Sequence, residues 1–200
     1  MVKTTIAALS FATLLLSSAA YAAPPAPVQS IDFSFVQSGG KACFKHDARV
    51  RANVQSVGPF EVLQLVGDHL PPNTSFSVFI IQVPTAPFGL SWYQGDFDTN
   101  DEGDAQASFV GRFQVGTFIL APGSAPAPQV FPDNASANPP TAPVQIYHLG
   151  IWFSSPDDAK NAGCPDTQTP FTSNHQAGIQ ALNTSNFAAT QGPLFFLNPP

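Results

Sequence analysis

Apolar and polar residues alternate along most of the chain after residue 30. Because successive side chains of a strand point to opposite faces of a sheet, this period of two predicts half-buried β-strands. The predicted strands cover residues 31–36, 43–57, 60–66, 75–83, 91–99, 105–120 and 144–153, with shorter segments at 178–183 and 194–197. Glycine and proline interrupt the pattern too often for long helices. We therefore predict an all-β protein, a single antiparallel β-sandwich of the immunoglobulin-like or jelly-roll-like kind.

Two of these strands are apolar on both faces. In the strand 75–83, Phe79 and Ile81 lie opposite a second apolar row, and residues 144–153 form an even more hydrophobic run. A strand that is covered on both faces lies in the middle of a sheet, so we place both strands centrally. The acidic turn at residues 100–103 separates two further strands and predicts a hairpin between them.

One short helix is predicted after the strand 144–153. Ser155 is a suitable N-cap, Pro156 fits the first turn, and Asp157 and Asp158 favour the positive end of the helix dipole. Gly163 is expected to end the helix in a left-handed conformation.

Residues 121–143 are rich in proline, alanine, serine and asparagine and show no periodicity. This composition is typical of a linker between domains. Cysteines on both sides of the segment favour a different interpretation, a long surface loop within one domain that covers residues 23–200.

The first 22 residues have the pattern of a signal peptide. Lys3 supplies a positive charge, residues 6–16 form a short apolar run, and Ala20, Tyr21 and Ala22 give a small-x-small cleavage motif. The apolar run is too short for a membrane anchor. We predict cleavage after Ala22 and a secreted, extracellular protein without membrane insertion.

Cys43 and Cys164 are the two cysteines of the chain. In an oxidising compartment, two thiols in one domain most simply form a disulfide. A zinc site is the alternative, but the two residues lack the close spacing of zinc ligands. We predict a Cys43–Cys164 bridge.

The composition is that of a folded acidic protein. Charged residues make up 10% of the chain, hydrophobic residues 44%, and the formal net charge is −6. Few charges together with 18 phenylalanines argue against disorder. An acidic surface repels phosphate groups, so nucleic acid is a poor partner.

Catalytic motifs are absent from the sequence. Residues 89–95 come nearest to the G-x-S-x-G motif of serine hydrolases, but the second glycine is two positions late. We interpret His148, which lies in an apolar run, as a core histidine. We expect the neighbours Asp68 and His69 to point to opposite faces of a strand. A secreted hydrolase whose His, Asp and Ser assemble in space around His148 or His69 stays open as the alternative.

Metal-binding patterns are also missing. The histidines at positions 46, 69, 148 and 175 form no closely spaced pair. The acidic residues between Asp96 and Asp104 suggest a calcium loop, but Asp101 and Ala107 occupy positions where the template needs Gly and Glu. We predict an acidic turn, no metal and no cofactor; an irregular calcium site is the alternative.

Phe88, Trp92 and Tyr93 form one aromatic cluster beside loop residues. Exposed aromatic rings can stack on sugars, and loops at the ends of strands commonly carry function. Because Trp92 and Tyr93 are neighbours on a strand, we expect at least one of them to pack in the core. These residues and the loop 121–143 are the predicted binding surface of a non-catalytic protein. Its expected partner is a polysaccharide or another extracellular protein.

Three N-glycosylation sequons begin at Asn73, Asn134 and Asn183. These asparagines can carry glycans only in a host that N-glycosylates secreted proteins.

Several strand and turn segments resemble secreted bacterial β-sandwich proteins of uncharacterised function. The segments that carry the resemblance are 70–74, 78–82, 95–99, 147–153 and 178–180. The resemblance implies a sandwich fold and export, and it carries over no catalytic residue.

Overall fold

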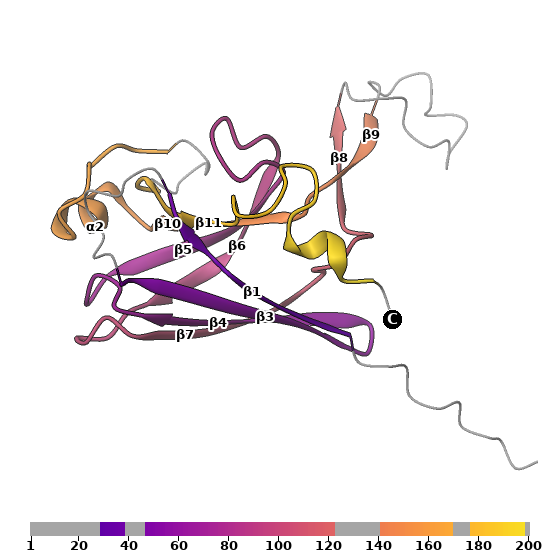
Figure 1. The fold of residues 1–200 in the computed structure, drawn as a ribbon. Helices are drawn as coiled ribbons and strands as arrows, with labels where there is room; N and C mark the ends of the chain where they lie inside the picture. Colours follow the sequence, from indigo (N-terminus) through magenta and orange to yellow (C-terminus); the bar gives the residue numbers. More distant parts are fainter. Residues whose placement is uncertain (1–28, 39–46, 123–140, 170–176, 199–200) are drawn as a thin grey trace, which may run out of the picture.

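A computed structural model describes residues 29–38, 47–122, 141–169 and 177–198 (Figure 1). The predicted signal peptide, Cys43, Asn134 and most of the loop 121–143 lie outside the described residues. Among the described residues, no helix is both long and apolar enough to cross a membrane.

The described strands form three antiparallel sheets. The first sheet has the order β1-β3-β4-β7 and the second has the order β2-β11-β10-β5-β6. Strands of the first sheet are β1 (Ser30–Ser34), β3 (Arg49–Val57), β4 (Phe60–Asp68) and β7 (Ala105–Gly111). Strands of the second are β2 (Val36–Gln37), β11 (Gln180–Asn183), β10 (His148–Phe153), β5 (Ser75–Ile81) and β6 (Ser91–Asp98). A separate pair joins β8 (Phe118–Pro122) to β9 (Thr141–Gln145). The predicted all-β, antiparallel class is confirmed.

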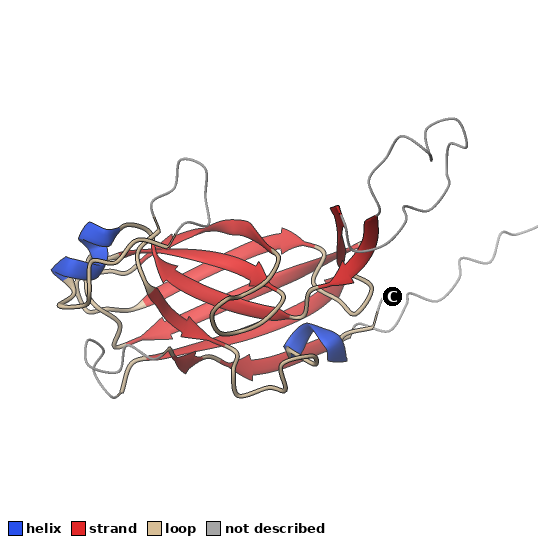
Figure 2. Ribbon diagram, turned by 90° about the horizontal axis from the view of Figure 1, so that it is seen from above, coloured by secondary structure: helices blue, strands red, loops and turns tan. Residues whose placement is uncertain are grey.

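The two larger sheets lie as two layers with one hydrophobic core between them (Figures 1 and 2). The inward-facing residues of each strand supply this core, for example Leu63 and Leu65 from β4 and Val78 and Ile80 from β5. The outward residues of β3 and β4 are exposed or half-buried, which is the alternation that the sequence predicted.

The two strands predicted to be central are buried as expected. β10 lies in the middle of the second sheet with β5 beside it, and every residue of β10 is buried. The prediction of one continuous strand over 144–153 was wrong. The chain leaves β9 at Gln145, pairs that strand with β8, and starts β10 only at His148.

The predicted hairpin at residues 100–103 was also wrong. β6 pairs with β5 in the second sheet, whereas β7 pairs with β4 in the first, so this turn is a corner between layers. The corner docks on the neighbouring turn: Leu70 N–H donates to the Gly103 carbonyl at 3.0 Å and Asn73 N–H donates to the Asn100 carbonyl at 3.0 Å.

A buried carboxylate ends the strand that was predicted over 105–120. Glu61 is fully buried, and its two oxygens accept hydrogen bonds from Phe113 N–H at 2.9 Å and from the Gln114 side-chain amide at 3.1 Å. These bonds satisfy polar atoms that would be costly to bury without partners, and they turn the chain away from the sheet after Gly111. The segment predicted as a strand at 194–197 is instead the 3-10 helix η1 (Pro193–Phe196).

The predicted helix is present as α2 (Pro156–Asn161). The Ser155 hydroxyl accepts a hydrogen bond from Asp158 N–H at 3.0 Å, as expected for an N-cap. Gly163 follows the helix with φ of +80°, and Cys164 is buried directly after it. The predicted loop 121–143 begins and ends in strands, since β8 reaches Pro122 and β9 starts at Thr141.

Candidate functional site

The predicted aromatic cluster is divided between the two faces of β6. Trp92 is half-buried against the main core, and its Nε1–H donates to Gln94 Oε1 at 3.2 Å. Tyr93 points to the outer face of the second sheet, where 43% of it is exposed. The expectation that at least one of the pair packs in the core is confirmed.

Phe88 shares the outer face with Tyr93. Its ring meets Trp152 edge to face at a centroid distance of 5.1 Å, and Trp152 meets Phe79 in the same way at 5.2 Å. The Tyr93 ring meets the Phe79 ring edge to face, with a distance of 5.8 Å between the ring centroids. Phe79, Trp152 and Phe88 thus form a row of packed rings, and the Phe79 end of this row fixes the orientation of the Tyr93 ring.

A row of polar side chains continues from Tyr93 along β5 and β6. The Tyr93 hydroxyl donates to Asp96 at 2.6 Å, the Ser77 hydroxyl donates to the other oxygen of Asp96 at 2.7 Å, and Ser75 donates to Asp98. The cross-strand register sets the two serine contacts, because Ser75 lies opposite Asp98 and Ser77 opposite Asp96. We call these five residues the outer strip.

The outer strip combines an apolar ring with hydrogen-bond acceptors. The hydrogen bond to Asp96, together with burial and the negative charge, raises the pKa of Tyr93 to about 12, so the phenol stays protonated. Asp96 and Asp98 are exposed, and carboxylate oxygens can each accept more than one hydrogen bond. The strip can therefore accept hydrogen bonds from ligand hydroxyl groups beside a fixed aromatic surface.

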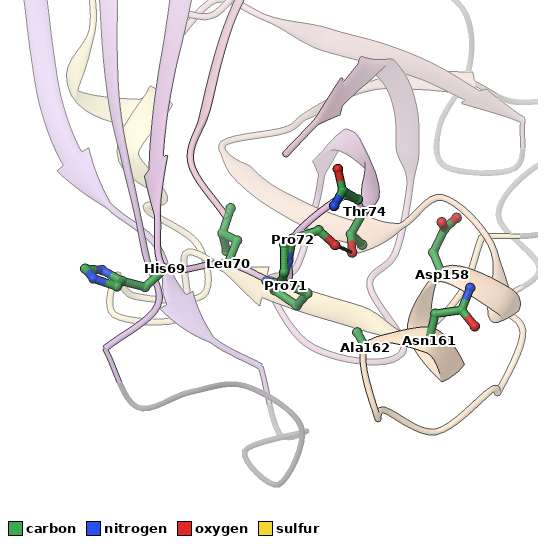
Figure 3. Close-up of a pocket in the computed structure, with 9 residues that line it drawn as sticks. His69, Leu70, Pro71, Pro72, Thr74, Asp158, Asn161 and Ala162 are labelled. Carbon is green, nitrogen blue, oxygen red and sulfur yellow. Dashed lines mark hydrogen bonds between the residues drawn. The ribbon is translucent and has the colours of Figure 1, made fainter. Parts of the chain in front are cut away.

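A pocket of about 260 Å³ lies between α2 and the turn that precedes β5 (Figure 3). Thr74 lines it and is followed directly by Ser75 of the strip. Leu70, Pro71, Pro72 and Ala162 form its apolar part, and His69, Asn73, Asp158 and Asn161 add polar groups. The sequence predicted the turn and the helix separately, but no local pattern indicated that they meet.

His69 does contact its neighbour, contrary to the prediction. The chain leaves β4 at Asp68, and His69 adopts a left-handed φ of +58°, so its Nδ1 lies 3.1 Å from Asp68 Oδ1. Asp47 lies on the other side, 3.9 Å from Nε2. Among the described residues, no hydroxyl group bonds to this imidazole, so a nucleophile–base pair is not assembled there.

His148 is a core histidine, as predicted, with two hydrogen bonds. Its Nε2 lies 3.1 Å from the Ala188 carbonyl, which can only accept, so Nε2 carries the proton. Nδ1 then accepts from the Thr184 hydroxyl at 2.9 Å. No carboxylate bonds to this ring within the described part of the chain, and burial lowers the pKa of His148.

We expect the stability to fall as the pH drops below the ordinary histidine pKa of 6.5. In that range the unfolded imidazole takes up a proton that buried His148 does not, and proton binding by the unfolded state favours unfolding. Urea unfolding at about pH 7.5 and about pH 5 measures how much the free energy of unfolding falls between the two pH values. The free energy of unfolding of the His148→Gln variant should fall less over this pH range. An equal fall in the variant and the wild type would assign the effect to other groups.

The acidic residues that suggested calcium have separate structural roles. Asp96 and Asp98 face the outer strip, whereas the Asn100 side-chain oxygen accepts from Glu102 N–H at 3.1 Å and Asp104 N–H at 2.7 Å. These bonds are typical of a turn closed by an asparagine. No group of three metal-ligating side chains occurs among the residues that the structure describes.

The sequons differ in accessibility. Asn183 is buried, and its amide donates to Gln180 Oε1 at 2.9 Å, so it is inaccessible once the chain has folded. Asn73 is exposed at the rim of the pocket.

Comparison with protein-family models, with curated proteins and with solved structures found no match to this chain.

Proposed function

We propose that this is an exported, non-catalytic protein that binds a neutral polysaccharide on the outer strip. The signal-peptide pattern of residues 1–22 supports export. We also propose that the two larger sheets form a β-sandwich, in which the exposed residues of β6 on the outer face of the second sheet carry the ligand.

The exposed, oriented ring of Tyr93 carries this proposal. A sugar ring presents apolar C–H groups on its faces and hydroxyl groups around its edge. Tyr93 offers a fixed aromatic surface for the first, and Asp96 and Asp98 offer acceptors for the second. The pocket between α2 and the turn before β5 has the same mixture of apolar and polar lining, so it offers the polymer a second surface of the same chemistry.

Charge favours a polymer without acidic groups. Asp96 and Asp98 lie on the strip and Asp158 lines the pocket. An anionic polysaccharide would meet like charges along the whole path, which costs affinity and slows association.

A sedimentation assay with insoluble cellulose, chitin and β-glucan tests the proposal. We expect the wild type to bind at least one polymer and Tyr93→Ala to bind about tenfold more weakly, since the substitution removes the aromatic surface. Phe118→Ala is the matched control, because Phe118 is 52% exposed and lies on β8, outside the strip.

Two results would contradict the proposal. One is that the wild type stays in solution with every polymer. The other is that it binds and that Tyr93→Ala and Phe118→Ala keep the same affinity, which would place the binding surface elsewhere. Circular dichroism of both variants shows whether the fold is retained.

A further inference from the structure

We infer that β7 is a self-association edge, through which two copies of this protein pair their first sheets in an antiparallel dimer. Among the described strands, β7 is the last of that sheet and pairs only with β4 (Figure 1). Its backbone makes no other hydrogen bond within the described residues. Every second N–H and C=O of the strand is therefore available to another strand.

β7 lacks the features that normally protect an edge strand. Such strands usually carry charges, prolines or bulges. The residues Ala105–Gly111 contain no charge and no proline, and their register with β4 is continuous. The neighbouring edge β6 is different, because it carries Asp96 and Asp98 and has a register shift opposite Val78 and Phe79.

Apolar side chains are exposed beside this edge. Val110 is 63% exposed on β7 itself, and on the same face Phe60 of the neighbouring β4 and Val57 of β3 are 52% and 53% exposed, further from the edge. Ala107 and Phe109 point inward but are only half-buried, which leaves the core partly open between β6 and β7. Another strand beside β7 would cover Val110, Ala107 and Phe109, and exposed apolar residues commonly mark such contacts.

The chemistry of β7 favours a second copy as the partner. Antiparallel pairing of a strand with itself is symmetric, so the same residues satisfy both chains. With Ser108 near the two-fold axis, Gln106 of each copy would lie opposite Val110 of the other. The net charge of −6 makes most contacts between copies repulsive, whereas this strand is neutral. Pairing would also join two outer strips in one particle, which raises the avidity for a polymer.

Light scattering coupled to size-exclusion chromatography, without any polysaccharide, tests the inference. We expect twice the monomer mass for the wild type and the monomer mass for Val110→Lys, since a lysine on an edge strand opposes pairing. Val66→Lys is the matched control. Val66 is 42% exposed on the same face, but it belongs to β4 in the interior of the sheet, so this variant should remain dimeric.

Hydrogen exchange provides a second measurement that does not depend on a substitution. Amides of residues 105–111 should become more protected as the wild-type concentration rises, while those of β6 should not change. A wild-type monomer throughout the micromolar range, or a dimer that persists in Val110→Lys, would overturn the inference. Neither result bears on polysaccharide binding, which is measured separately.

Discussion

Breaking the predicted Cys43–Cys164 bridge should lower the free energy of unfolding by about 4–5 kcal/mol, because the bridge closes a loop of about 120 residues. Such a cross-link removes conformations mainly from the unfolded chain, and the effect grows with the length of the loop. Cys164 is buried directly after α2, where its N–H donates to the Ala159 carbonyl at 2.8 Å. The bridge would therefore attach the helix end of the pocket to the segment that precedes β3.

Cys43→Ala is the informative variant, because it removes the bridge and leaves the buried sulfur of Cys164 in place. Its stability in guanidinium should equal that of the reduced wild type and lie well below that of the oxidised protein. Intact mass with and without alkylation shows the redox state. Two thiols that react in the native, unreduced protein would rule out the bridge.

The strands could be predicted because their information is local. Alternation identified β3 and β4, and continuous apolar runs identified β5 and β10, since burial of one or both faces leaves a pattern within a few residues. The end of β7 depends on Glu61, which lies 52 residues before Phe113 in the chain. No pattern within residues 105–120 contains that interaction, so the sequence predicted a strand that was too long.

The candidate site was predictable only in part, for the same reason. The sequence singled out Tyr93 and Phe88 by their aromatic character, and it separated Trp92 from Tyr93 by strand alternation. The pairing of Ser77 with Asp96 requires the register between β5 and β6, which a shift opposite Val78 and Phe79 alters. Asp96 therefore appeared in the sequence as part of an acidic turn, whereas it orients the tyrosine hydroxyl.

Gly103→Ala should destabilise the protein by about 3 kcal/mol, through a clash added to backbone strain. Gly103 has a φ of +85°, which disfavours any side chain, and a Cβ there would lie 2.1 Å from the Leu70 carbonyl oxygen. That oxygen belongs to the backbone and cannot move without separating the corner between β6 and β7 from the turn that forms the pocket. Thermal and urea unfolding measure the loss.

Gly58→Ala separates the two causes of this loss. Gly58 has a φ of +59°, but among the described residues no atom beyond its two chain neighbours lies within 4 Å of the position that a Cβ would take, so alanine there meets strain alone and should cost about 1 kcal/mol. The difference between the two variants reports the steric contact at the corner. If both variants lose the same stability, the close approach of the Leu70 carbonyl oxygen to a Cβ at position 103 adds no cost. The corner would then tolerate a separation of the two turns, and the pocket between α2 and Thr74 would not depend on their close approach.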